Sequence, residues 1–206
     1  MEKVRFEDIR QSLQTGDLIF FSGEYAFSKV IEFIEDSPWS HVGMVIRLPG
    51  DDNLYLFEST SLVNLEDELY HDRIKGPKVV DLYDRLSSYG KELVPYKQCD
   101  FGVRKANFER TEETHTHLFT YIHDTHGIPT PDEWEMCKEV IEGKILNKAD
   151  DNTFIFCSEL VAETYMAMGV LNNDHPGNFY TPKDMATQTV EDHAFCSFGD
   201  VMELLI

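Results

Sequence analysis

The sequence predicts an α+β domain in which an antiparallel sheet packs against helices. Its 206 residues are 42% apolar and 12% aromatic, enough for one domain with a substantial core. Segments with strand character lie mainly in the first half of the chain, and the longer amphipathic segments lie in the second half. We therefore expect residues 1–206 to form a single domain, with a helical insert around residues 108–150.

Strands are expected where short apolar runs lie between turn residues. Residues 18–21 (Leu-Ile-Phe-Phe) lie between a Gly-Asp turn and a Ser-Gly turn, a pattern typical of a buried strand. Residues 41–47 and 54–60 flank a connector rich in Pro, Gly, Asp and Asn, which predicts a hairpin. Weaker strand candidates are residues 79–82 and 93–96, and the charged stretch 62–78 is expected on the surface.

Helices are expected where apolar residues recur at helical spacing after a capping signal. Thr111 can cap a helix running to about residue 126, and Thr130 followed by Pro131 and acidic residues predicts another. The remaining helical segments are expected at residues 25–35, at 157–169, and as a short closing helix after residue 200, with a Pro-led turn at 181–184.

The charge balance excludes some partners. The chain has 38 acidic and 18 basic residues, a formal net charge of −20. Such a surface repels polyphosphates and anionic membranes, so we expect no nucleic-acid partner. No run approaches the roughly 20 apolar residues that span a bilayer, and residues 1–8 lack the pattern of a signal peptide, so we expect a cytoplasmic protein without a transmembrane segment.

Cys157 is the cysteine with a setting suited to chemistry. It stands where an apolar run, residues 154–156, meets the first turn of an amphipathic helix. Unpaired N–H groups and the helix dipole favour a thiolate there and could stabilise an oxyanion. The other cysteines, Cys99, Cys137 and Cys196, form no CxxC pair and are expected to be reduced thiols, which argues against a zinc knuckle or redox dithiol.

His41 and Glu58 are candidates for a base and its orienting partner. His41 opens one strand of the predicted hairpin, and Glu58 lies near the end of the other. Such positions are neighbours across a hairpin, so the two side chains can meet. Gly43, in the strand that His41 opens, leaves room for another element to approach closely.

These segments resemble a known family. Gly16-Asp17-Leu18-Ile19-Phe20-Phe21, Ser40-His41-Val42-Gly43-Met44-Val45 and Phe156-Cys157-Ser158-Glu159-Leu160-Val161 are similar to the core motifs of NlpC-type papain-like thiol hydrolases. Here the cysteine segment comes last, an order that resembles the circularly permuted branch of YiiX-like and YaeF-like proteins and, more distantly, lecithin retinol acyltransferases. The resemblance covers most of the chain except residues 66–76 and 108–150. It implies a circularly permuted papain-like fold, with an antiparallel sheet or small barrel and the nucleophile at a helix N-terminus.

The resemblance also implies roles for single residues. Cys157 would be the nucleophile, His41 the general base and acid, and Glu58 the group that orients His41. Ser158 could give a backbone N–H to the oxyanion hole, Asp17 could bind substrate or cap a turn, and Trp39 could wall the cleft or belong to the core. The expected function is a cofactor-free cysteine peptidase or amidase that acts on a small peptide or amino-acid conjugate through a thioester acyl-enzyme.

Other interpretations stay open at this point. The same thiol chemistry would serve a lipid acyltransferase or esterase, and the fold could also be a binding module without chemistry. His115, His117, His123 and His126 raise the question of a metal site, but a solvated helix face explains them better, and no metal is expected. The acidic clusters, residues 66–68 among them, are expected to be solvated surface.

Overall fold

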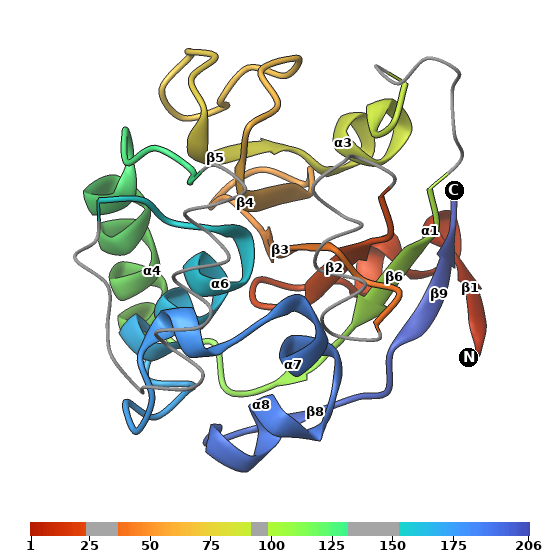
Figure 1. Cartoon of the computed structure of the whole chain (residues 1–206). Helices are drawn as coiled ribbons and strands as arrows, with labels where there is room; N and C mark the ends of the chain where they lie inside the picture. The colour runs from red at the N-terminus through yellow and green to blue at the C-terminus, as the bar shows by residue number, and fades with distance from the viewer. Residues whose placement is uncertain (24–36, 92–98, 132–152) are drawn as a thin grey trace.

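The computed structural model describes residues 1–23, 37–91, 99–131 and 153–206. Within these residues, seven strands form one sheet in the order β1-β9-β6-β2-β3-β4-β5, and a short pair, β7 and β8, forms a second (Figure 1). In the large sheet, β1 and β9 pair in parallel and every other neighbouring pair is antiparallel. The expectation of an α+β fold with an antiparallel sheet packed against helices is confirmed, apart from the parallel pairing of β1 with β9.

The bounds of the elements follow. The strands are β1 (Lys3–Arg5), β2 (Leu18–Phe21), β3 (His41–Ile46), β4 (Tyr55–Thr60), β5 (Gly76–Asp81), β6 (Phe101–Arg104), β7 (Ala106–Asn107), β8 (Ser197–Phe198) and β9 (Met202–Leu205). The helices are α1 (Phe6–Ile9), α3 (Leu82–Ser88), α4 (Glu112–Thr125), α6 (Cys157–Ala167), α7 (Pro182–Ala186) and α8 (Gln188–His193), with single 3-10 turns η1 (Arg10–Ser12) and η2 (Gly177–Phe179).

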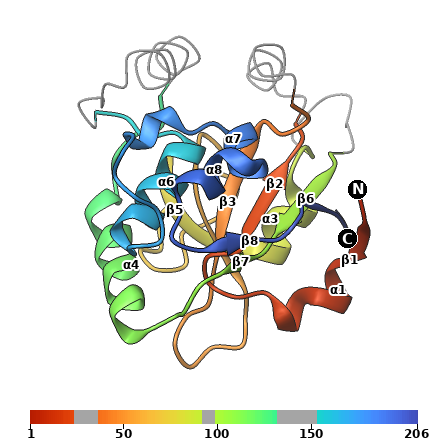
Figure 2. The ribbon, with the colours of Figure 1, turned by 90° about the horizontal axis from the view of Figure 1, so that it is seen from below.

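Alternate residues of the central strands serve two hydrophobic layers. On one face, residues such as Phe20, Met44 and Phe57 pack with α6, and α4 lies outside α6 (Figures 1 and 2). On the other face, Ile19 and Leu56 pack with residues of α1 and α3. Both faces are therefore covered, which explains why β2, β3 and β4 are buried along their whole length.

Several local predictions are confirmed. The strand at Leu18–Phe21 and the antiparallel pairing of β3 with β4 are present. Thr111 caps α4 by accepting a hydrogen bond from the Thr114 N–H. A helix begins at Cys157, as expected.

Other predictions are wrong. The closing segment after residue 200 is not a helix but strand β9, which lies between β1 and β6, so the two terminal strands lie side by side (Figure 1). Residues 181–184 are not only a turn, because Thr181 caps the short helix α7. The stretch 62–78 is not all surface, since its last residues form the start of β5, where Lys78 is buried.

Some predictions lie outside the described residues. These are the helix at 25–35, the strand at 93–96 and the helix expected beyond Pro131, together with Cys137. Of the insert expected around residues 108–150, the structure describes α4 and the residues up to 131.

Candidate active site

Cys157 is the first residue of α6 and lies in a nearly closed environment. Its exposed fraction is 6%. The Ser59 hydroxyl donates a 2.6 Å hydrogen bond to the carbonyl oxygen of Ile155, which ties the segment before Cys157 to strand β4 beside Glu58. The first turn of an α-helix leaves its N–H groups without intrahelical partners. Cys157 therefore combines a sulfur atom with nearby donors suited to a negative charge.

The structure brings His41 and Glu58 together. The distance between His41 Nε2 and Glu58 Oε2 is 2.7 Å, and the Glu58 side chain is completely buried. Met44 lies opposite Phe57 in the β3–β4 register, so Glu58 lies beside Gly43, two residues along the strand from His41. The neighbourhood expected from the hairpin is therefore present in the structure.

The second oxygen of Glu58 contacts a buried arginine. Arg85, in α3, donates from Nε to Glu58 Oε1 at 2.6 Å, and both side chains have no exposed surface. Burial alone would raise the pKa of Glu58, but Arg85 and then His41 outweigh it and lower that pKa to about 2. Glu58 is thus an anion throughout the physiological pH range.

His41 is a basic histidine in this environment. Burial disfavours its charged form, but interactions with Cys157 and Glu58 outweigh burial and raise the pKa of His41 to about 9. Glu58 occupies Nε2, which leaves Nδ1 for Cys157. At neutral pH the His41 imidazole is accordingly protonated on both nitrogens.

Aromatic rings enclose the same imidazole. The Phe21 ring centroid is 5.2 Å from that of His41, and the Tyr89 ring lies nearly parallel to His41 at 6.2 Å. The imidazole is therefore packed against two aromatic rings.

The remaining residues expected at the site fall into different places. Ser158 follows Cys157 in α6, is fully buried, and its hydroxyl has no hydrogen-bond partner among the described residues. Trp39 is 5% exposed and packs on Phe20 and over Gly102, so it lies in the core beneath the start of β3.

Asp17 does not lie with Cys157, His41 and Glu58. It precedes β2, whereas His41 pairs with Phe21 at the other end of that strand. The Asp17 carboxylate accepts hydrogen bonds from the N–H groups of Gln14 and Ala106, and burial raises its pKa despite these donors. Its contacts are those of a buried residue that joins two segments.

Arg85, Tyr89 and Phe21 were missed as site residues at the sequence level. Arginine is usually exposed, so a single Arg in a short polar segment gives no signal of burial. One signal was present: Asp81 followed by Leu82 and Leu86 is a capped amphipathic turn, and the Asp81 side chain does accept from the Asp84 N–H.

The His-bearing helix makes contacts with the loop before β5. The His126 ring stacks on Tyr70 at 3.7 Å and its Nε2 lies 3.2 Å from Asp72 Oδ2, while His123 Nδ1 lies 3.1 Å from the Tyr70 hydroxyl. These nitrogens are used within the protein. Asp67, from the acidic cluster expected on the surface, is instead buried and accepts from the N–H groups of Leu69 and Val79.

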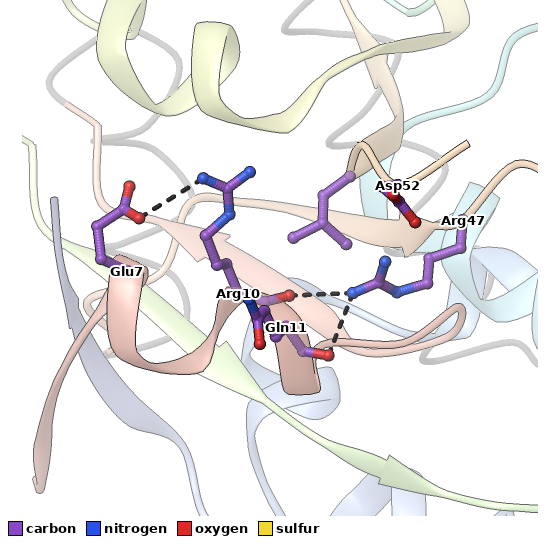
Figure 3. A pocket seen from close by; sticks show the side chains of 6 residues that line it. Glu7, Arg10, Gln11, Arg47 and Asp52 are labelled. Carbon is purple, nitrogen blue, oxygen red and sulfur yellow. Dashed lines mark hydrogen bonds and ion pairs between the residues drawn. The ribbon is translucent and has the colours of Figure 1, made fainter.

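A polar pocket of about 650 Å³ lies at the opposite end of β3 from His41 (Figure 3). Its lining includes Glu7, Arg10 and Arg47. The Arg47 guanidinium donates to the carbonyl oxygens of Arg10 and Leu13, so it closes the end of η1. We assign Arg47 a structural role.

Comparison with known proteins shows a structural relative. No family model matches the chain, and no curated protein matches it in sequence. A solved structure does: metalloprotein YiiX from Escherichia coli O157:H7, with a TM-score of 0.51 and 19% identity over 87% of this chain and 79% of that one. The chain therefore has a YiiX-like fold.

The word metalloprotein describes YiiX, and the residues described here do not fit a metal ion. In the ranges that the structure describes, no group of three or more His, Cys, Asp and Glu side chains is arranged to hold one. Both Glu58 oxygens are already occupied, by His41 and by Arg85. Likewise, no helix among the described residues has the length and apolar character needed to cross a membrane.

Proposed function

We propose that this protein is a cysteine hydrolase with Cys157 as nucleophile, His41 as general base and acid, and Glu58 as the residue that orients His41. The observation that carries the proposal is the buried 2.7 Å contact between His41 and Glu58, next to a cysteine at a helix N-terminus that itself raises the pKa of His41. A base held by a third group and directed at a nucleophile is the arrangement that activates a thiol.

In the first half of the reaction the thiol proton resides on His41 Nδ1 and Cys157 Sγ attacks the substrate carbonyl carbon. The negative charge moves to the carbonyl oxygen, where N–H groups at the start of α6, that of Ser158 included, would stabilise it. The carbon–nitrogen bond then breaks as His41 gives its proton to the leaving amine, and a thioester to Cys157 remains.

In the second half a water molecule replaces the amine. His41 Nδ1 takes a proton from the water, and the resulting oxygen nucleophile attacks the thioester carbonyl. The carbon–sulfur bond breaks, the acid product leaves, and the proton on His41 again neutralises the thiolate. Glu58 remains ionised throughout and stabilises each imidazolium state.

We propose a small peptide or amino-acid conjugate as the substrate, because the catalytic side chains are nearly closed off from solvent and the chain is strongly acidic. His41 is 9% exposed and Cys157 is 6% exposed, which favours a slender acyl group. A net charge of −20 favours neutral or cationic molecules over anionic polymers. The order of His41 before Cys157 on a YiiX-like fold supports a circularly permuted papain-like arrangement.

Selective alkylation tests the proposal directly. With iodoacetamide at pH 6 to 7 (roughly the window below an ordinary thiol pKa), Cys157 should react much faster than Cys99 and Cys196, measured peptide by peptide by mass spectrometry. Equal rates at all of these thiols would refute an activated cysteine. Incubation with a cell extract followed by intact-mass analysis should capture an acyl group on the wild-type chain and none on Cys157→Ala, and the added mass would identify the acyl class.

A further inference from the structure

Arg85 lies behind the proposed site rather than in it. It is fully buried in α3, and its Nε donates to Glu58 Oε1 while Glu58 Oε2 faces His41. Glu58 therefore connects the arginine to the histidine, with one carboxylate oxygen committed to each.

Burying this ion pair costs desolvation energy on both sides. The Coulomb attraction between a buried carboxylate and a guanidinium roughly offsets the hydration energy that both lose on leaving water. Well-packed apolar residues at the same positions often stabilise a fold as much or more. One guanidinium nitrogen, Arg85 Nη2, even lacks a hydrogen-bond partner among the described residues. Stability is therefore a poor explanation for this pair, whereas control of the Glu58 carboxylate is a good one.

The arginine is itself held in place. Arg85 Nη1 donates to Asn64 Oδ1 at 3.1 Å, and Asn64 Nδ2 donates to the Ser88 hydroxyl at 3.2 Å, one turn further along the same helix. These contacts fix the plane of the guanidinium, and that plane sets the direction from which Glu58 Oε1 is held.

The same helix also reaches His41. The Tyr89 N–H donates to the Arg85 carbonyl oxygen, so the two side chains leave α3 one turn apart, and the Tyr89 ring lies parallel to His41. Arg85 thus contacts the orienting carboxylate while Tyr89 contacts the imidazole.

We propose that Arg85 is a positioning residue of the Cys157–His41–Glu58 site: it keeps Glu58 ionised and fixes its second oxygen, so that His41 is held by Nε2 with Nδ1 toward Cys157. The inference rests on the proposed function. Arg85 touches neither substrate nor sulfur and acts through Glu58.

The charged groups around the pair are few. Glu58 is faced by His41 from β3, Arg85 from α3 and Lys78 from β5. Lys78 donates to the Leu62 carbonyl oxygen, and burial lowers its pKa. His41 is faced by Cys157 from α6 and by Glu58. Arg85 is the cation that contacts the Glu58 oxygen not used by His41. Removing Arg85 should therefore change the pKa of Glu58 first.

The test is the pH dependence of Cys157 alkylation by iodoacetamide, measured on the full chain between pH 5 and 9. In Arg85→Met, Glu58 takes up a proton more readily, His41 loses its anionic partner, and the thiolate loses its imidazolium. The acid limb of the profile should therefore move up by about one pH unit, which slows alkylation about tenfold at pH values below the limbs of both proteins. Arg85→Lys should recover part of the rate, because an ammonium supplies charge without the planar fork.

Two further variants separate positioning from simple loss of structure. Arg104 is another buried arginine, which donates to the carbonyl oxygens of Met185, Thr187 and Gly199. Arg104→Met should lower the melting temperature and leave the alkylation profile in place. In a Glu58→Gln background, adding Arg85→Met should produce no further displacement of the profile.

The outcomes are distinct. If wild-type Cys157 is no more reactive than the other thiols, the proposed function fails and the role of Arg85 fails with it. If wild-type Cys157 is reactive but folded Arg85→Met has an unchanged profile, or shifts equally with Glu58→Gln present, the role of Arg85 alone is overturned. If Arg85→Met does not fold, Arg85→Lys and Asn64→Ala decide: unchanged profiles in both overturn the proposal, and displaced acid limbs support it.

Discussion

Replacing Glu58 with Gln should change how the stability of this protein depends on pH. Glu58 has a pKa of about 2 in the folded protein against an ordinary value of 4.5. A carboxyl whose pKa is lowered by folding stabilises the folded state above its ordinary pKa and loses that contribution as the pH falls through the folded value. The difference between these two pKa values adds about 3 kcal/mol to the free energy of unfolding at pH 7. About 1 kcal/mol of this contribution remains at pH 3.

The assay is urea denaturation of wild type and Glu58→Gln at pH 3, 5 and 7, with unfolding free energies from linear extrapolation. The variant should be less stable at pH 7, and the difference between the two proteins should shrink by about 2 kcal/mol on going to pH 3. The cost of leaving Arg85 without its carboxylate contributes at every pH in this range, because the guanidinium stays protonated. The change of the difference with pH therefore reports the Glu58 carboxylate together with His41, whose pKa Glu58 helps to raise.

Asp17→Asn provides a control, because its stability difference from wild type should change with pH in the opposite direction. Burial raises the pKa of Asp17, so protonation of this carboxyl at low pH favours the folded state. The stability of wild type relative to Asp17→Asn should thus rise as the pH falls. A wild-type advantage over Glu58→Gln that stays constant between pH 7 and pH 3 would refute the assignment of Glu58 as a buried anion held by Arg85 and His41.

Three further predictions follow from single contacts. Cys157→Ala should lower the pKa of His41, because Cys157 is the strongest of the interactions that raise it, and an NMR titration of the His41 imidazole would measure the change; an unaltered titration would contradict their contact. Gly43→Ala should cost about 1–3 kcal/mol, because a Cβ there would lie 2.8 Å from the Leu56 side chain, and chemical denaturation should show a smaller cost in a Leu56→Ala background than alone. Gly76→Ala should destabilise the start of β5, since Gly76 has φ +114° and a Cβ would lie 2.1 Å from the Ile128 carbonyl oxygen; a melting temperature equal to that of wild type would contradict this.

The sequence was sufficient to predict the parts of the site that depend on neighbouring residues. The hairpin that joins His41 to Glu58 is local, and its register follows from two strands and a short connector. The helix that begins at Cys157 is also local. What joins these parts, the Ser59 to Ile155 hydrogen bond, spans 96 residues and leaves no pattern in either segment.

Two of these errors have the same physical origin, partners that lie elsewhere in the chain, and one comes from a local signal. Residues 202–205 form a short apolar run, which periodicity alone cannot assign to helix or strand, and their partners β1 and β6 lie far away in the chain. Residues 181–184 carried a helix signal, a capping Thr followed by Pro. The Asp184 carboxylate completes the cap by accepting hydrogen bonds from the Thr181 N–H and hydroxyl. The sequence predicts Lys78 in a charged surface stretch, but its pairing with Glu58 in the sheet buries the Lys78 side chain.

Helix α3 and the residue that follows it contact the buried His41–Glu58 pair from one side. Leu82 and Leu86 are buried and lie one turn apart, so they seat the helix on the sheet. Arg85 and Tyr89 follow each leucine by three residues, and this spacing places them on the same side of the helix. The packing of these two leucines thereby places the Arg85 guanidinium beside Glu58 and the Tyr89 ring beside His41. A change that moves α3 without altering its charges, such as Leu86→Ala, should consequently disturb the Cys157 alkylation profile as well as the core. A truncation of equal size at a buried leucine outside α3 and α6, such as Leu13→Ala, should affect stability alone.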